Sequence, residues 1–257
     1  MRIWGKVLGF LFGFMLSKNI FGALLGLWVG HSFDKGRSLN FGSLGGSSDH
    51  QLDFFYTTFA VMGHIAKANG QVSSHEIAFA TAYMNKLGLN KALKQQAQDA
   101  FREGKMAGFP LEERIESLRQ SCRNRQDLVL LFLEIQIQVA FADGQLDAAE
   151  RAALHKIAKL LGYSVSDLDK LLEMIIAGAQ FHQQQSSPQQ LDNAYKLLGV
   201  KKDTPARDIK KAYKKLMAQH HPDKLVAKGL PPEMMEAAKQ KTQDIQAAYE
   251  LVSKSQE

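Results

Sequence analysis

The chain has 257 residues, 45% of them hydrophobic, which is enough for one large or two modest domains plus further segments. Its single cysteine, Cys122, excludes an intrachain disulfide framework and a multi-cysteine zinc site. Most of the formal net charge of +6 lies near the C-terminus, because residues 191–257 hold thirteen Lys and Arg residues against nine Asp and Glu residues.

Residues 3–31 are almost wholly apolar and predict a membrane anchor. The apolar run on either side of residues 17–19 is too short to cross a bilayer, which takes about 20 helical residues, but the two runs together are long enough. Lys18 near the middle costs about 3 kcal/mol on insertion scales, which the surrounding apolar side chains can offset. We expect residues 1–33 to form a retained single-pass anchor; a buried hairpin or a membrane-surface helix is the alternative.

Glycines recur at intervals of four along this anchor, a pattern that lets helices approach closely in lipid. Glycine is also simply common in membrane helices, so the pattern alone does not require self-association. Two sets of three at the same spacing nevertheless favour a homodimer. The set that we expect at the contact is Gly22, Gly26 and Gly30, and the other set is Gly5, Gly9 and Gly13.

Residues 34–50 are rich in Gly, Ser and Asn and predict a flexible linker, and the Gln-rich residues 181–190 predict a second one. Between them, residues 51–180 show helical periodicity interrupted by Gly and Pro, with no sustained strand alternation. The helices expected in this domain cover residues 51–69, 74–87, 90–104, 111–121, 126–142, 147–161 and 166–179.

An internal repeat lies within this domain, because residues 66–72 (AKANGQV) match residues 140–146 (AFADGQL). Glu76 and Glu150 follow the two copies at the same distance. Each copy ends one helix at a glycine and begins another behind a polar cap. The pattern resembles the TerB-like helical domain, named for tellurite-resistance proteins, over roughly residues 52–180.

The second copy of the repeat also has the oxygen ligands that suit a hard cation such as calcium, in Asp143, Asp147 and Glu150. The ligand spacing of a calcium loop is missing, however, and the first copy has Asn69 and Ser73 in place of the two aspartates. Helix capping explains these residues without a metal, and we expect no metal site. The adjacent His220 and His221 lack a third ligand, so we expect none there either.

Two amphipathic helices joined by a polar His-Pro-Asp segment are expected in residues 204–252. Thr204 is expected to cap the first helix with Pro205 at its first position, and Pro222 to end it near His221. The first helix has an apolar face opposite a row of basic residues. The apolar face is Ile209, Ala212, Tyr213 and Leu216, and the buried face of the second helix is Met234, Ala238, Ile245, Ala248, Tyr249 and Val252.

Four blocks of this region resemble the J domain of DnaJ-type co-chaperones: residues 191–200 (LDNAYKLLGV), 211–216 (KAYKKL), 221–224 (HPDK) and 248–251 (AYEL). The resemblance implies docking on a DnaK-type chaperone and stimulation of its ATP hydrolysis, with a GrpE-type factor in the cycle. By position, the residues expected to contact DnaK are His221, Pro222 and Asp223 in the signature loop and Lys210, Lys211, Tyr213, Lys214 and Lys215 on the helix before it.

Other classes of function fit the sequence less well. A basic helix could bind nucleic acid, but no base-reading or stacking side chains accompany these lysines, so we expect no nucleic-acid partner. No Gly-rich phosphate loop, nucleophile elbow or paired-carboxylate motif is present, so we expect neither an enzyme nor a cofactor. The main alternative is a non-enzymatic membrane signalling scaffold that acts through the TerB-like domain.

The order of anchor (1–33), TerB-like domain (51–180) and J domain (191–257) resembles the membrane-anchored DnaJ-like co-chaperones of bacteria. We therefore expect an all-α protein with a single transmembrane helix, a TerB-like helical domain and a C-terminal J-domain helical hairpin. Charges flanking the anchor are balanced, but a cytoplasmic partner implies an inner-membrane protein with its N-terminus in the periplasm and its C-terminal domains in the cytoplasm. The resemblance further implies a link to the Rcs phosphorelay and capsule synthesis.

Overall fold

The computed structural model describes residues 47–70, 72–183 and 188–256, and these ranges contain helices and no strand. The all-α prediction is confirmed for this part of the chain. The expected anchor, with Gly22, Gly26 and Gly30, lies outside the described residues. No described helix combines the length and the apolar character needed to cross a membrane.

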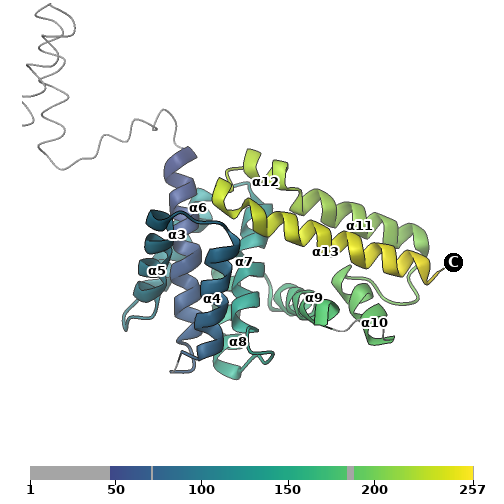
Figure 1. Ribbon diagram of the computed structural model, residues 1–257, viewed down its shortest axis with the longest axis horizontal. Coiled ribbons are helices and arrows are strands. Elements are labelled where there is room, and N and C mark those ends of the chain that lie inside the picture. Colours follow the sequence, from purple (N-terminus) through teal and green to yellow (C-terminus); the bar gives the residue numbers. More distant parts are fainter. Residues whose placement is uncertain (1–46, 71, 184–187, 257) are drawn as a thin grey trace, which may run out of the picture. The chain divides into compact units, whose positions relative to one another are not determined.

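Seven helices form what we call the helical domain (Figure 1). Their bounds lie close to those expected from the sequence, because glycines and polar caps mark most of the breaks. They are α3 (Ser47–Ala66), α4 (Ser74–Lys86), α5 (Lys91–Gly104), α6 (Leu111–Ser121), α7 (Gln126–Ala140), α8 (Ala148–Leu160) and α9 (Val165–Gln183).

The helices extend into both segments expected as linkers. Helix α3 begins at Ser47, and α9 continues to Gln183, while α10 (Pro188–Leu197) begins only a few residues later. Composition alone missed this extension because Phe181, inside the Gln-rich segment, is 7% exposed and packs in a cluster with residues of α10. The burial of Phe181 therefore attaches the end of α9 to its neighbours within an otherwise polar stretch.

The two copies of the repeat begin α4 and α8 with the same capping box, as the sequence predicts. Glu76 N–H donates to Ser73 Oγ at 3.1 Å, and Ser73 N–H donates to Glu76 Oε2 at 2.7 Å. In the second copy Glu150 N–H donates to Asp147 Oδ1 at 2.8 Å, and Asp147 N–H donates to Glu150 Oε2 at 3.0 Å. Asn69 joins the two turns, since its Nδ2 donates to Asp147 Oδ2 at 2.9 Å.

The core of the helical domain surrounds α7, whose side chains are buried on nearly every face. Helices α3 and α5 cross beside it in direct backbone contact. A Cβ atom added at Gly104 would lie 1.7 Å from the carbonyl oxygen of Ala60, and one added at Gly63 would lie 2.1 Å from that of Phe101. Only glycine fits at this crossing.

The chain ends in a helical pair, α11 (Ala206–His220) and α13 (Met235–Lys254), which we call the C-terminal hairpin (Figure 1). Tyr213 and Tyr249 stack between the two helices with their ring centroids 4.2 Å apart. Most of the predicted apolar residues are buried here, although Ala212 and the two tyrosines are only half-buried. The segment that connects them contains α12 (Pro222–Ala227) and the short 3-10 helix η1 (Pro232–Met234).

The predicted start of α11 is wrong. Pro205 lies at the N-cap with extended geometry (φ −59°, ψ 145°) and makes no side-chain cap. The hydroxyl of Thr204 instead accepts a hydrogen bond from Lys201 N–H at 3.1 Å. Thr204 therefore closes the preceding turn and does not cap α11.

The connecting segment of the C-terminal hairpin packs into the core of the helical domain. Leu225, Leu230 and Met234 of this segment, together with Ala238 at the start of α13, belong to the same apolar cluster as the side chains of α7, and each is 0% exposed. Burying a Leu or Met side chain stabilises a fold by roughly 1.5–3 kcal/mol, so separating these parts would cost several kcal/mol. Residues from Asp49 onward accordingly form one compact unit.

Candidate functional site: the exposed tip of the hairpin

The His-Pro-Asp segment joins α11 to α12 and includes the first residues of α12; we call residues 221–224 the tip. Pro222 disfavours helical geometry at the residue before it, and His221 has extended dihedral angles (φ −61°, ψ 121°). The ring of His221 caps the next helix, because Asp223 N–H donates to His221 Nδ1 at 3.2 Å. The sequence His-Pro-Asp therefore both ends one helix and starts the next.

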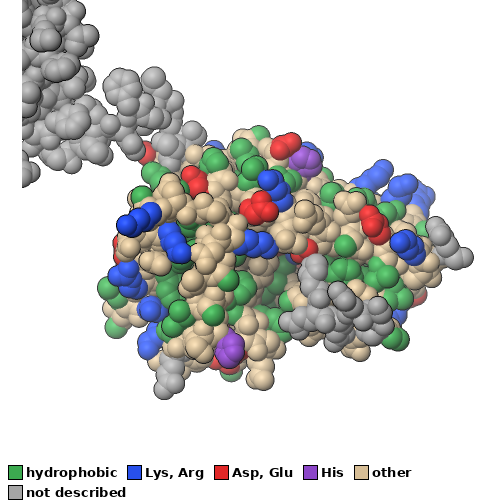
Figure 2. Space-filling view, in the orientation of Figure 1, with side chains coloured by type: hydrophobic (Ala, Val, Ile, Leu, Met, Phe, Trp, Pro, Cys, Tyr) green, Lys and Arg blue, Asp and Glu red, His purple; other side chains and the backbone are tan. Residues whose placement is uncertain are grey.

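The tip and the helix before it present their polar groups to solvent. His221, Asp223 and Lys224 are exposed, and Pro222 is half-buried. The basic face of α11, defined as Lys210, Lys211, Lys214 and Lys215, is exposed along its length. Figure 2 shows blue side chains gathered over α11, and none of the four lysines pairs with a carboxylate among the described residues. This surface can attract an acidic partner.

His220, directly before the tip, points the other way and is 1% exposed. Its Nε2 lies 3.5 Å from Glu134 Oε1 on α7, and Lys241 Nζ on α13 lies 3.6 Å from the same oxygen. Burial lowers the pKa of His220, an effect that Glu134 opposes and Lys241 reinforces. A buried carboxylate needs a counter-charge, and Lys241 supplies it while His220 stays neutral near pH 7.

A second ion pair joins the end of α12 to the helical domain, between Lys228 and Asp127 in the first turn of α7. Leu225, one turn earlier, is fully buried in the core. Residues 221–224 are therefore an exposed segment between two buried or paired attachment points.

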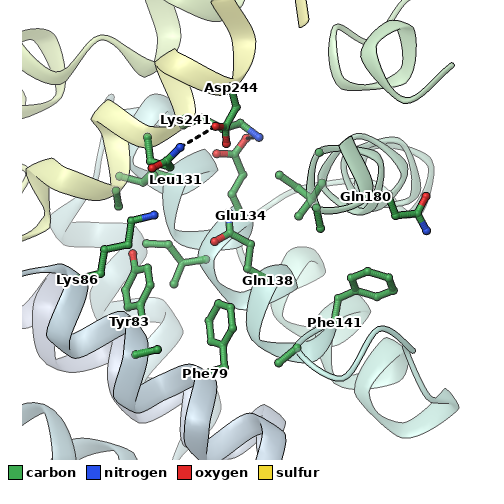
Figure 3. A pocket seen from close by; sticks show the side chains of 18 of the residues that line it. Phe79, Tyr83, Lys86, Leu131, Glu134, Gln138, Phe141, Gln180, Lys241 and Asp244 are labelled. Carbon is green, nitrogen blue, oxygen red and sulfur yellow. Dashed lines mark hydrogen bonds and ion pairs between the residues drawn. The ribbon is translucent and has the colours of Figure 1, made fainter. Parts of the chain in front are cut away.

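A cavity of about 800 Å³ lies beside these contacts, between α4, α7, α9 and α13. Phe79, Leu131 and Phe141 are among its apolar lining residues, and Glu134 and Lys241 are among the polar ones (Figure 3). The hydroxyl of Tyr83 and Oε2 of Glu134 have no hydrogen-bond partner among the described atoms. Elsewhere, no group of three or more His, Cys, Asp or Glu residues in the described ranges is arranged to hold a metal ion.

The predicted contact residues thus lie together on one surface, with Tyr213 half-buried beneath it against Tyr249. Sequence reasoning missed the buried group under the tip, namely His220, Glu134 and Lys241, and the half-buried Asp127 beside it. Two signals were available. His220 continues the apolar spacing set by Ile209, Tyr213 and Leu216, and Glu134 interrupts an otherwise apolar run on α7.

Comparisons with known proteins match the chain along its whole length. Family models for the "Co-chaperone DjlA transmembrane domain", "Tellurite resistance protein TerB" and "DnaJ domain" match residues 1–40, 56–173 and 193–257. The co-chaperone protein DjlA of Photobacterium profundum is 48% identical over 98% of both chains. The chain belongs to the DjlA family of co-chaperones. The DjlA proteins of Escherichia coli K12 and Yersinia pestis are 47% and 46% identical, over 98% and 99% of this chain and 97% and 98% of their own.

Membership of the DjlA family confirms the predicted order of a transmembrane anchor, a TerB-like domain and a J domain. The helical domain described above is the TerB-like part, and α10 to α13 with η1 form the J domain. No solved structure was found to match the chain. The chain is therefore a J-domain co-chaperone with a membrane anchor, and the exposed tip lies in its J domain.

Proposed function

We propose that this protein docks on a DnaK-type chaperone through the tip and the basic face, and stimulates its ATP hydrolysis from the membrane surface. The observation that carries the proposal is that His221, Asp223 and the four lysines stay exposed although the segment after the tip is buried in the core of the TerB-like domain. A partner can therefore approach this surface without separating the two domains. A GrpE-type nucleotide-exchange factor would complete the cycle.

In this proposal the two parts of the surface act differently. Lys210, Lys211, Lys214 and Lys215 attract an acidic surface of the chaperone, which raises the rate of association and depends on salt. His221 and Asp223 make short-range contacts whose geometry Pro222 restricts. Tyr213 supports the basic face from below by stacking on Tyr249.

A single-turnover ATPase assay of the chaperone with residues 49–257 tests this function. The unmodified protein should stimulate hydrolysis, and Lys214→Glu/Lys215→Glu should raise the concentration needed for half-maximal stimulation at low salt. That difference should shrink as salt screens the charges. The control Lys91→Glu/Lys159→Glu reverses two exposed lysines of the TerB-like domain and should stimulate like the unmodified protein. Absence of any stimulation would favour the signalling scaffold instead.

The placement in the cell follows from the anchor. We propose that residues 1–33 span the bacterial inner membrane once, with the N-terminus in the periplasm and the domains from residue 51 onward in the cytoplasm, where the chaperone is. Tethering would direct chaperone action to clients near the membrane. One outcome would be an influence on the Rcs phosphorelay and capsule synthesis. We propose no nucleic-acid partner. A reporter that is active only in the cytoplasm, fused after Glu257, should give signal. A signal from a periplasmic reporter at that position would refute the topology.

A further inference from the structure

We propose that the TerB-like domain takes part in the function of the J-domain tip. In this proposal Glu134 is a positioning residue that holds the tip in the geometry needed to contact the chaperone. The inference rests on the proposed function and extends it, because it assigns a role in stimulation to a residue outside the J domain. It would also make the two domains one functional body.

The first support is the way in which the tip is attached. The residue before it, His220, is 1% exposed, and Leu225 shortly after it is 0% exposed, whereas His221, Asp223 and Lys224 between them are exposed. Both attachment points face the TerB-like domain: His220 lies against Glu134, and Leu225 belongs to the core around α7. The position and tilt of the short exposed segment are therefore set by two points on another domain.

The second support is the chemistry of Glu134. Its Oε1 lies within ion-pair distance of both His220 on α11 and Lys241 on α13, and its side chain is 3% exposed. This carboxylate thus pairs with Lys241 on α13 and lies 3.5 Å from the ring of His220 on α11, although neither ring nitrogen of His220 has a hydrogen-bond partner among the described atoms. Because a buried lysine without its counter-charge is costly, loss of the Glu134 charge would drive Lys241 on α13 toward solvent and loosen α11, which packs against α13.

The third support is that the attachment leaves the surface for the chaperone free. The lysines of the basic face are exposed on the side of α11 away from His220, so neutralising Glu134 does not alter them. The proposal therefore separates two measurable quantities. Docking through the lysines should persist, and the maximal stimulation, which depends on the geometry of His221, should fall.

The test uses residues 49–257 with Glu134→Gln, which keeps the shape of the side chain and removes its charge. Two readings are taken: the concentration dependence of stimulation in the single-turnover assay, and amide hydrogen exchange at residues 220–228. We expect a several-fold fall in maximal stimulation at nearly unchanged half-maximal concentration, together with faster exchange at residues 220–228 and unchanged exchange in α3 and α5. Glu113→Gln, an exposed carboxylate on α6, is the matched control and should change neither reading.

A general loss of folded protein would instead raise exchange everywhere and lower stimulation in proportion to the unfolded fraction. If Glu134→Gln does not fold, Glu134→Asp decides, because it keeps the charge and shortens the reach of the carboxylate toward α11 and α13. The proposal is overturned if the deciding variant stimulates like the unmodified protein, or if it loses stimulation without faster exchange at residues 220–228. Failure of the unmodified protein to stimulate would refute the proposed function, and the exchange data would then judge the attachment alone.

Discussion

Replacing His221 by Gln should abolish stimulation of the chaperone while leaving the fold nearly unchanged. The side chain of His221 is exposed, and its one hydrogen bond within the described residues is the one that Nδ1 accepts from Asp223 N–H, at 3.2 Å. Loss of an N-cap costs about 0.5–2 kcal/mol, and this cap serves a helix whose place is also fixed by the buried Leu225. We therefore expect a cost of about 1 kcal/mol, which lowers Tm by roughly 2–4 °C in a unit of this size.

That cost is small beside a total stability of about 5–15 kcal/mol, so the variant stays folded at the temperature of the assay. Circular dichroism would follow the helix content and Tm, and the single-turnover assay would follow stimulation. His75→Gln makes the same replacement at an exposed position on α4 and should keep full stimulation. Stimulation like that of the unmodified protein, or a loss of helicity that accompanies the loss of activity, would refute the role of His221 as a contact.

Three further predictions concern other parts of the chain. Gly104→Ala should lower Tm far more than a surface change, because its Cβ would meet the carbonyl of Ala60 in rigid backbone; a Tm close to that of the unmodified protein would contradict the crossing. Burial raises the pKa of Glu150 from 4.5 to about 7, so the folded state favours the protonated side chain. The stability that this gives is fully present below pH 4.5 and is lost as the pH rises through 7. Glu150→Gln, which stays neutral, should therefore raise Tm at pH 8 but not at pH 5. In a membrane two-hybrid assay, replacement of Gly22, Gly26 and Gly30 by leucine should weaken association of the full chain. Unchanged association would exclude these three glycines as the contact.

Local signals in the sequence predicted most helix bounds, because caps and glycines act through neighbouring residues. Ser73 with Glu76, and Asp147 with Glu150, identify two helix starts by spacing alone. Thr204 shows where such reasoning fails: its hydroxyl accepts from Lys201 N–H before it rather than from the helix after it, and the sequence does not say which of these it will do.

The exposed part of the site could be predicted, and the buried part could not. The His-Pro-Asp tip is a local motif, and the lysines of α11 follow from helical spacing. The pairing of Glu134 with His220 and Lys241 depends on how two domains pack, and periodicity indicates only that a side chain faces inward, not what it meets. Leu225 and Leu230 likewise lie outside the helices expected from the sequence, and only the packed structure shows that they are buried in the core around α7.

The hydrogen bond between the two repeat turns bears on how the domain arose. If a single unit was duplicated, residues 69 and 143 began as the same residue, as did residues 73 and 147. Two aspartates facing each other across the turns would repel, whereas Asn69 now donates to Asp147. Divergence of the two copies at these positions therefore lets the turns meet. We expect residues 69 and 147 to change together in related chains. An acidic side chain at one position should be accompanied by a hydrogen-bond donor at the other.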